Sequence, residues 1–160
     1  MFQAVSVAVI VILIVIDQLT KYAAVVTVKG KDPIEFLFGL FQFTYVENTG
    51  AAFSSFSNST TLLTVATVII LIGCLILLLT KKIKSKFMNV CLVLVIAGGV
   101  GNVIDRIANG YVVDFINPLF VDFAVFNFAD CCITVGAILM IGYQIYEIIR
   151  DYKNKSKKND

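Results

Sequence analysis

Four long apolar segments constrain the fold of this chain more than any other feature of its sequence. Residues 2–26, 60–79, 87–107 and 128–149 are dominated by apolar side chains, and none of these segments contains a proline. A helix of roughly 20 residues is long enough to cross the hydrocarbon core of a bilayer, which is about 30 Å thick. We therefore predict a mainly α integral membrane protein, in which four continuous transmembrane helices belong to a single domain over residues 1–160.

The composition supports this class and excludes several kinds of chemistry. Hydrophobic residues make up 59% of the chain and charged residues 15%, against about 45–50% and 25% in soluble domains. The net charge of +2 gives no reason to expect a nucleic-acid partner. The chain has no histidine, which excludes His-dependent nucleophiles and imidazole metal ligands. Its four cysteines lack metal-binding spacing, so we expect neither a metal nor a cofactor.

The distribution of lysine and arginine predicts the orientation in the membrane. Nine basic residues lie between the second and third segments or after the fourth: Lys81, Lys82, Lys84, Lys86, Arg150, Lys153, Lys155, Lys157 and Lys158. The other two connections contribute only Lys29, Lys31 and, at a helix end, Arg106. Because cytoplasmic loops carry an excess of basic residues, we predict that both termini are cytosolic in a multi-pass protein.

The two connections on the outer side carry signals for strands and turns. Residues 30–58 contain a partly alternating aromatic series from Phe36 to Tyr45, which is typical of a small sheet. In the second connection, residues 108–125, we predict turns at Asn109-Gly110 and Asn117-Pro118 and a short strand over residues 111–113. We therefore expect a small β segment, at about 30–58, on the outer face of the helices.

Polar residues that a membrane should exclude gather at the same outer end. Asp17 and Lys21 interrupt the first helix at a spacing of four residues, which suits an ion pair. The others at or near this level are Asn48, Asn102, Asp105, Arg106, Asp114, Asn127 and Asp130. Each of these residues also has a purely structural explanation. Asn127 and Asp130, for example, suit a helix cap. Their coincidence at one level indicates a functional site, because ionisable residues are costly at membrane depth.

Without histidine or a metal cluster, the chemistry left to such a site is that of carboxylates. Two aspartates brought close together share a proton, because two like charges about 3 Å apart cannot both ionise. One can then accept a proton from water while the other donates a proton to a carbonyl oxygen, as in an aspartyl peptidase. From the residues alone, Asp17, Asp105, Asp114 and Asp130 all remain candidates for this pair.

Five blocks in this chain resemble, in order, the signature blocks of the bacterial lipoprotein signal peptidases (signal peptidase II). They are DQLTK at 17–21, NTGAAF at 48–53, GNVIDR at 101–106, VVDFI at 112–116 and FNFAD at 126–130. The resemblance implies an aspartyl endopeptidase of the bacterial cytoplasmic membrane that removes the signal peptide from a diacylglyceryl-modified prolipoprotein, cutting just before the lipidated cysteine. It implies a β-cradle over an active site at the outer face.

The same resemblance assigns roles within the site. Asp114 and Asp130 would form the catalytic dyad. Residues that bind substrate or support the dyad would be Asp17, Lys21, Asn48, Gly50, Asn102, Asp105, Arg106 and Asn127. The partners it implies are the diacylated prolipoprotein, membrane lipid and inhibitors of the globomycin type, and we expect the enzyme to be a monomer.

Two other functions compete with a peptidase. A small ion or proton transporter would use intramembrane aspartates as a relay. Such a relay would place carboxylates at several depths, and transporters commonly have internal repeats and broken helices, which this sequence lacks. A non-catalytic four-helix assembly factor is the other alternative, and it would tolerate replacement of a dyad aspartate by asparagine.

Overall fold

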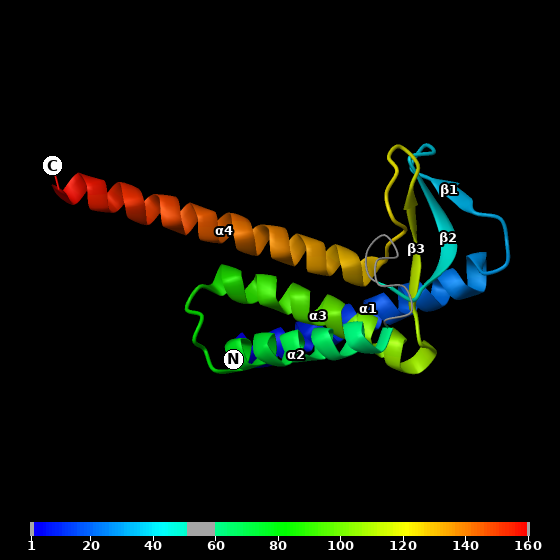
Figure 1. Cartoon of the computed structure of the whole chain (residues 1–160), viewed down its shortest axis with the longest axis horizontal. Coiled ribbons are helices and arrows are strands. Elements are labelled where there is room, and N and C mark those ends of the chain that lie inside the picture. The colour runs from blue at the N-terminus through cyan, green and yellow to red at the C-terminus, as the bar shows by residue number, and fades with distance from the viewer. Residues whose placement is uncertain (1, 51–59, 160) are drawn as a thin grey trace.

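The computed structural model describes residues 2–50 and 60–159, and it consists of a helical bundle with a small sheet at one end (Figure 1). The elements are α1 (Phe2–Val28), β1 (Ile34–Phe36), β2 (Phe41–Asn48), α2 (Thr60–Leu79), α3 (Lys86–Asn109), β3 (Val112–Pro118) and α4 (Phe128–Asn159). Within the described residues, these four helices are long and apolar enough to cross a membrane. The predicted class of a four-helix membrane protein with a small sheet is therefore confirmed.

The helices in the structure begin and end within two residues of the predicted ranges, except at the end of α4. This helix continues to Asn159, ten residues beyond the predicted end at 149. Residues 150–159 contain no glycine or proline and are rich in lysine, so nothing in them breaks a helix. The apolar pattern predicts where a helix leaves the hydrocarbon, which is a different point from where it stops being helical.

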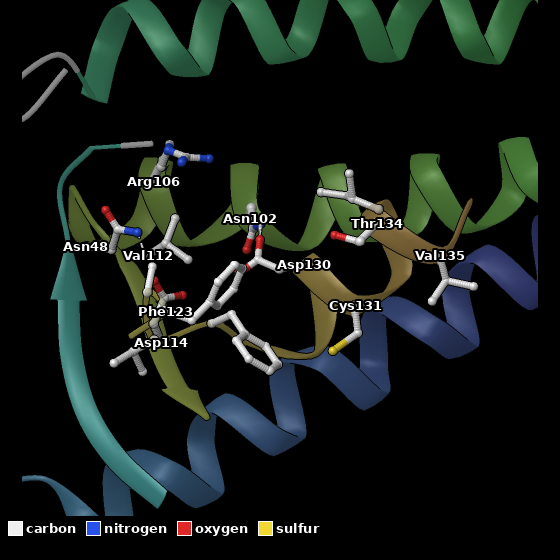
Figure 2. A pocket seen from close by; sticks show the side chains of 14 residues that line it. Asn48, Asn102, Arg106, Val112, Asp114, Phe123, Asp130, Cys131, Thr134 and Val135 are labelled. Carbon is white, nitrogen blue, oxygen red and sulfur yellow. Dashed lines mark hydrogen bonds between the residues drawn. The ribbon is translucent and has the colours of Figure 1, made fainter. Parts of the chain in front are cut away.

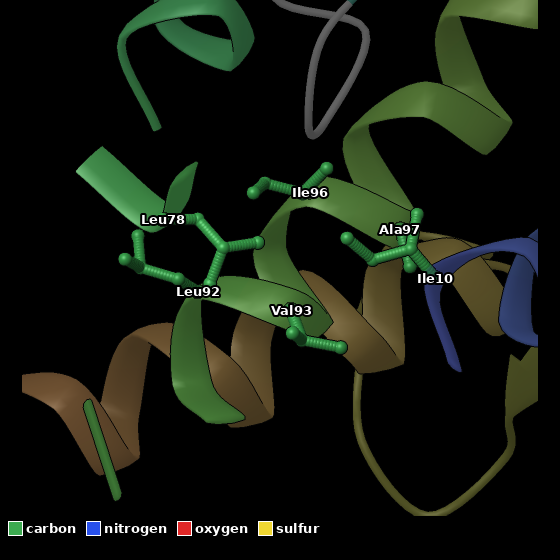
Figure 3. Close-up of a cluster of buried hydrophobic side chains, with 6 residues drawn as sticks. All are labelled: Ile10, Leu78, Leu92, Val93, Ile96 and Ala97. Atoms are coloured by element: carbon green, nitrogen blue, oxygen red, sulfur yellow. The ribbon is translucent and has the colours of Figure 1, made fainter. Parts of the chain in front are cut away.

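Helix α3 is the centre of the bundle, and the other three helices are more exposed. Most of the membrane-spanning part of α3 is buried, whereas Leu78 is the one buried residue on α2 among those described. Side chains from three helices form the apolar core beside it, namely Ile10, Leu78, Leu92, Val93, Ile96 and Ala97 (Figure 3). The exposed apolar faces of α1, α2 and α4 suit contact with lipid, which is as apolar as the side chains themselves.

The ends of α3 are fixed by local signals. Ser85 caps the N-terminus by accepting a hydrogen bond from the backbone N–H of Met88. Gly110 ends the helix in the left-handed conformation, with φ of 82°, and its N–H donates to the carbonyl of Arg106. The predicted turn at Asn109-Gly110 is therefore a helix cap, and it sends the chain directly into β3.

The small sheet has the order β1-β2-β3, and both pairs are antiparallel. Phe36 and Phe43 stack across β1 and β2 with their ring centroids 4.1 Å apart, so the aromatic series forms the predicted sheet. Strand β3 is longer than the predicted strand at 111–113 and includes Asn117 and Pro118, where we predicted a turn. Pro118 is tolerated because it ends the strand, where a missing N–H costs little.

The sheet is attached to the C-terminal end of α1 by a second apolar cluster. Ala24 and Val28 of α1 pack against Phe115 of β3, with Phe43 and Tyr45 of β2 alongside. This packing fixes β2 and β3 relative to the helices, so the polar residues at the ends of these strands face the end of the bundle. The remainder of the predicted β segment, at 51–58, lies outside the described residues.

Candidate active site

A buried charged cluster joins α1 to α3 at the end of the bundle that carries the sheet. The Lys21 ammonium lies 2.9 Å from a carboxylate oxygen of Asp17 and 3.0 Å from one of Asp105. All three side chains are at least 96% buried. Charges buried to this extent are tolerated when they are paired and hydrogen-bonded. The predicted Asp17–Lys21 pair is present, with Asp105 as a third member.

The two carboxylates of this cluster also bind backbone groups of other elements. Asp17 accepts a hydrogen bond from the N–H of Ala129 at the start of α4, at 2.9 Å. Asp105 accepts one from the N–H of Val113 in β3, at 3.0 Å. Gly101 allows the close approach of α1 and α3 here, because a Cβ at this position would collide with the Asp17 carboxylate. The cluster therefore fixes α1, α3, α4 and β3 relative to one another.

Two asparagine amides connect the charged cluster to the next pair of acids. The Asn102 carbonyl oxygen accepts hydrogen bonds from Lys21 Nζ at 3.0 Å and from Asn127 Nδ2 at 3.2 Å. The Asn102 amide nitrogen donates to Asp130 Oδ1 at 2.8 Å. Asn127 Nδ2 also donates to Asp114 Oδ1, at 2.6 Å. Asn127 is fully buried, so its amide acts as a fixed bridge.

Asp114 is held in β3 by amide groups on both of its oxygens. Asn48 Nδ2 at the end of β2 donates to Asp114 Oδ2 at 2.8 Å, and Asn127 Nδ2 donates to Asp114 Oδ1. The side chain is buried, with 2% of its residue surface exposed. Burial, opposed by the Asn48 hydrogen bond and assisted by the nearby Asp130 charge, raises the pKa of the Asp114 carboxyl to about 6. This acid therefore holds a proton more readily than an exposed aspartate.

Asp130 lies in the first turn of α4 and closes that turn. Its Oδ2 accepts from the backbone N–H of Asn127 at 3.2 Å, while the Asn127 side-chain oxygen accepts from the N–H of Asp130 at 2.9 Å. This reciprocal arrangement is a capping box, as the spacing of Asn127 and Asp130 suggested. The structural and the functional readings of this pair are therefore compatible, because the same carboxylate also lines a cavity.

The cavity in front of the two acids has a volume of about 440 Å³. Its polar side is formed by Asn48, Asn102, Arg106, Asp114 and Asp130. Figure 2 shows Asn102 and Asp130 pointing toward one another, with Asp114 and Phe123 on the wall of the same cavity. Residues that complete the wall are Val112, Phe123, Ala124, Val125, Phe126, Cys131, Ile133, Thr134 and Val135. A site with one polar and one apolar wall suits a peptide that carries a large apolar group.

Arg106 holds the chain beyond β2 against α3. Its Nη2 donates to the carbonyl oxygen of Gly50 at 3.2 Å, and the Gly50 N–H donates to the side-chain oxygen of Asn48 at 2.9 Å. Gly50 therefore takes part through its backbone, and its bond to Asn48 orients the amide that reaches Asp114. Residues 51–53 of the NTGAAF block lie outside the described residues.

All ten residues named from the sequence are brought together, in two connected groups. Asp17, Lys21 and Asp105 form the charged cluster, and the other seven surround the cavity or its amide bridges. Sequence reasoning missed Gln18, whose amide donates to Asp17 at 3.2 Å and to Asp105 at 3.0 Å. The position of Gln18 beside Asp17 in an apolar helix could have indicated that it belongs to the charged cluster. It also missed the apolar wall at 123–126, which has no polar pattern.

Comparisons with known proteins place this arrangement in a family. The sequence model described as "Signal peptidase (SPase) II" matches residues 9–146. The chain is 40% identical over 129 residues to the lipoprotein signal peptidase of Streptococcus thermophilus, covering 81% of this chain and 84% of that protein. It is 36% identical over 159 residues to that of Staphylococcus aureus, covering 98% and 95%. The chain belongs to the signal peptidase II family.

Solved structures agree with this membership of the signal peptidase II family. A structure described as a bacterial membrane enzyme has a TM-score of 0.80 at 34% identity, covering 95% of this chain and 92% of its own. A second, with the same description, has a TM-score of 0.79 at 36% identity, covering 88% and 92%. The resemblance predicted from the five blocks is confirmed, and the family membership indicates a membrane protease.

Proposed function

We propose that the chain is an aspartyl endopeptidase that removes the signal peptide from diacylglyceryl-modified prolipoproteins, cutting just before the lipidated cysteine. The observation that carries this proposal is the environment of Asp114 and Asp130. Both acids border one cavity, and among the described residues their hydrogen-bond partners are amides and backbone N–H groups rather than cations. A buried carboxylate beside a partly buried one, with no ammonium between them, is suited to sharing a proton.

The reaction follows from that shared proton. The ionised carboxylate takes a proton from water, and the water oxygen bonds to the carbonyl carbon of the scissile peptide. The protonated acid gives its proton to the carbonyl oxygen, which produces a neutral tetrahedral diol. When the C–N bond breaks, the first acid returns its proton to the leaving nitrogen and the second recovers one from a hydroxyl. Both acids end in their starting states, and no metal takes part.

The mixed character of the cavity supports a lipidated substrate. The polar wall of amides and acids can bind the extended peptide around the scissile bond. The apolar wall at 123–126 and on α4 offers a surface for the acyl chains. A substrate whose signal peptide is a membrane helix would bring the bond to this level without leaving the bilayer.

The decisive experiment compares a prolipoprotein with and without diacylglycerol. Purified enzyme in detergent should cleave the lipidated form, and the product should begin with the lipidated cysteine by mass spectrometry. The unlipidated form should be cleaved far more slowly. Globomycin should block the reaction and EDTA should leave it unchanged. Loss of cleavage in EDTA, with recovery on adding zinc, would contradict an aspartyl mechanism.

We further propose that the site faces outward from the bacterial cytoplasmic membrane, with both termini cytosolic. The nine basic residues at the opposite end support this orientation. A reporter fused after Asp160 should be active only in the cytosol, and one inserted at 119–122 only outside. The reverse pattern would overturn the orientation without affecting the assignment of the dyad.

A further inference from the structure

The charged cluster and the two proposed catalytic acids are joined through the side chain of Asn102. Lys21 has three N–H donors, and they have three acceptors: Asp17 at 2.9 Å, Asp105 at 3.0 Å and the Asn102 carbonyl oxygen at 3.0 Å. The ammonium group is thus fully hydrogen-bonded although it is almost completely buried. The contact with Asn102 is the one that leads toward the cavity.

The surroundings of Asn102 permit only one orientation of its amide. Its oxygen faces two donors, Lys21 Nζ and Asn127 Nδ2, and its nitrogen faces the Asp130 carboxylate. Rotating the amide by half a turn would set its NH₂ group against an ammonium, which has donors and no acceptor. It would also place the carbonyl oxygen against the carboxylate. A buried cation therefore keeps the Asn102 N–H directed at Asp130.

We propose that Lys21 is a positioning residue for the reaction: by fixing the Asn102 amide, it keeps Asp130 as the ionised acid that accepts the proton from water, and leaves the shared proton on Asp114. This inference rests on the proposed function and assigns the two roles that the proposed mechanism leaves open. Hydrogen bonds from donors stabilise a carboxylate more than a neutral acid.

The rest of the site favours the same assignment. Asp130 accepts a second hydrogen bond from the Asn127 backbone N–H at the N-terminus of α4, where the helix dipole stabilises negative charge. Asp114 is in a strand without such a dipole, and burial raises its pKa to about 6. A protonated acid still has lone pairs for the amides of Asn48 and Asn127, so its proton remains free to reach a substrate.

Titratable and charged groups face Asp130 from every element packed against it. Lys21 acts from α1 through Asn102, Arg106 from α3, Asp114 from β3 and Cys131 from α4. The loop before α4 adds Asp122, which borders a second cavity beside Asp114. Of these groups in the described part of the chain, Lys21 is the cation that acts through a side-chain amide donating to Asp130, so variants of Lys21 and Asn102 should behave as one unit.

The test is the pH dependence of kcat/KM for a diacylglyceryl-modified prolipoprotein peptide, measured on the full chain in detergent and normalised to folded enzyme. Asn102→Ala removes the donor to Asp130. The low-pH side of the kcat/KM profile, called the acidic limb below, should therefore move to higher pH by roughly 1 pH unit or more. Lys21→Met should move it in the same direction. The double variant should match Asn102→Ala, because both changes remove the same hydrogen bond.

Asn102→Asp keeps the proposal testable if Lys21→Met does not fold. The new carboxylate can still accept from Lys21, so the charged cluster keeps its partner, but it cannot donate to Asp130. The acidic limb should again move upward. A limb that stays at the wild-type position in this variant overturns the proposal, and so does a double variant whose shift equals the sum of the single shifts.

Gln18→Met is the matched control. Gln18 donates to Asp17, to Asp105 and to the Gly101 carbonyl, and it has no hydrogen bond to Asn102. This variant should lower the melting temperature and leave the acidic limb in place. An equal shift in the control would mean that any disturbance of the cluster moves the limb, which also overturns the proposal. If wild-type enzyme fails to cleave, or Asp130→Asn retains turnover, the proposed function fails instead.

Discussion

Two pairs of aspartates lie at the same end of this protein, one fully buried and one beside a cavity, and their neighbours give them opposite properties. Asp17 and Asp105 have an ammonium between them, whereas Asp114 and Asp130 are joined through Asn127, whose side-chain amide donates to Asp114 and whose backbone N–H donates to Asp130. An ammonium neutralises charge, so the first pair is suited to holding helices together. An amide satisfies lone pairs without neutralising charge, so the second pair keeps its proton exchangeable. All four residues are aspartates, and the group that lies between the two members of each pair decides what that pair can do.

The largest effect should come from removing one ionisable group of the second pair. Asp114→Asn and Asp130→Asn should each reduce turnover per folded enzyme by about 10² or more, because general acid or base catalysis is typically worth 10²–10⁴. The double variant should be hardly slower than either single one, since the two acids work as a unit. The measurement is cleavage of a lipidated prolipoprotein. Near-normal turnover in either single variant would show that the dyad is assigned wrongly.

A second effect concerns the pH dependence of stability. The pKa of Asp114 rises from 3.8 to about 6 on folding, so its ionisation opposes the folded state, and the stability present below pH 3.8 is lost as the pH rises through 6. The shift corresponds to roughly 3 kcal/mol at most. Asp114→Asn should remove this loss, so its melting temperature relative to wild type should increase between pH 4 and pH 7.

Asp122→Asn is the control for that measurement, because Asp122 is an exposed residue of the loop between β3 and α4. Its melting temperature relative to wild type should stay constant over the same pH range. If the two variants gave the same curve, the pH dependence would not come from Asp114.

The first pair should respond in stability rather than in turnover. Asp17→Asn removes a charged partner of Lys21, and a hydrogen bond between charged groups is worth roughly 2 kcal/mol. We expect a lower melting temperature in detergent and less folded protein, with a much smaller loss of turnover per folded molecule than in the dyad variants. A well-folded Asp17→Asn enzyme without activity would contradict the division into a structural and a reactive pair.

The smallest effect on stability and turnover is expected from a substitution in an exposed ion pair, where water screens the charges. Lys29 lies 3.1 Å from Glu47, with about half of each side chain exposed. Hydrogen bonds with Tyr45 and Glu47 raise the pKa of Lys29, so it stays charged at any pH used for an assay. Exposed pairs contribute little to stability. Glu47→Gln should therefore leave melting temperature and turnover unchanged.

Much of this arrangement could be predicted from the sequence, because a membrane makes polar residues conspicuous. Asp17 and Lys21 stand out in an apolar helix, and the distribution of lysines predicts that they lie at the same end as Asp114 and Asp130. The aromatic series predicted the sheet. Each of these inferences needs only local pattern and the length of a helix.

What the sequence could not provide is the choice of partner for each acid. Asp105 and Asp114 both lie near the C-terminal end of α3, yet of these two only Asp105 reaches Lys21, because Gly101 lets α1 approach α3 at that level. Asp114 is turned toward Asn48 by the register of β2 and β3, in which Val46 pairs with Asp114. Both outcomes depend on packing between distant segments, so pattern alone left four aspartates as candidates.

The reciprocal cap at the start of α4 limits how the protein could evolve resistance to a compound that fills the cavity. Asp130 closes the first turn of α4, accepts from Asn102 and borders the cavity. Asn127 shares this cap and donates to Asp114, and Asn102 binds Lys21 and borders the cavity, so under the proposed mechanism a change at either residue should disturb folding and catalysis together. Phe123 is half exposed and belongs to the apolar wall. Substitutions that survive selection should gather on that wall, and compounds that bind mainly to the amides and acids should keep their potency longest.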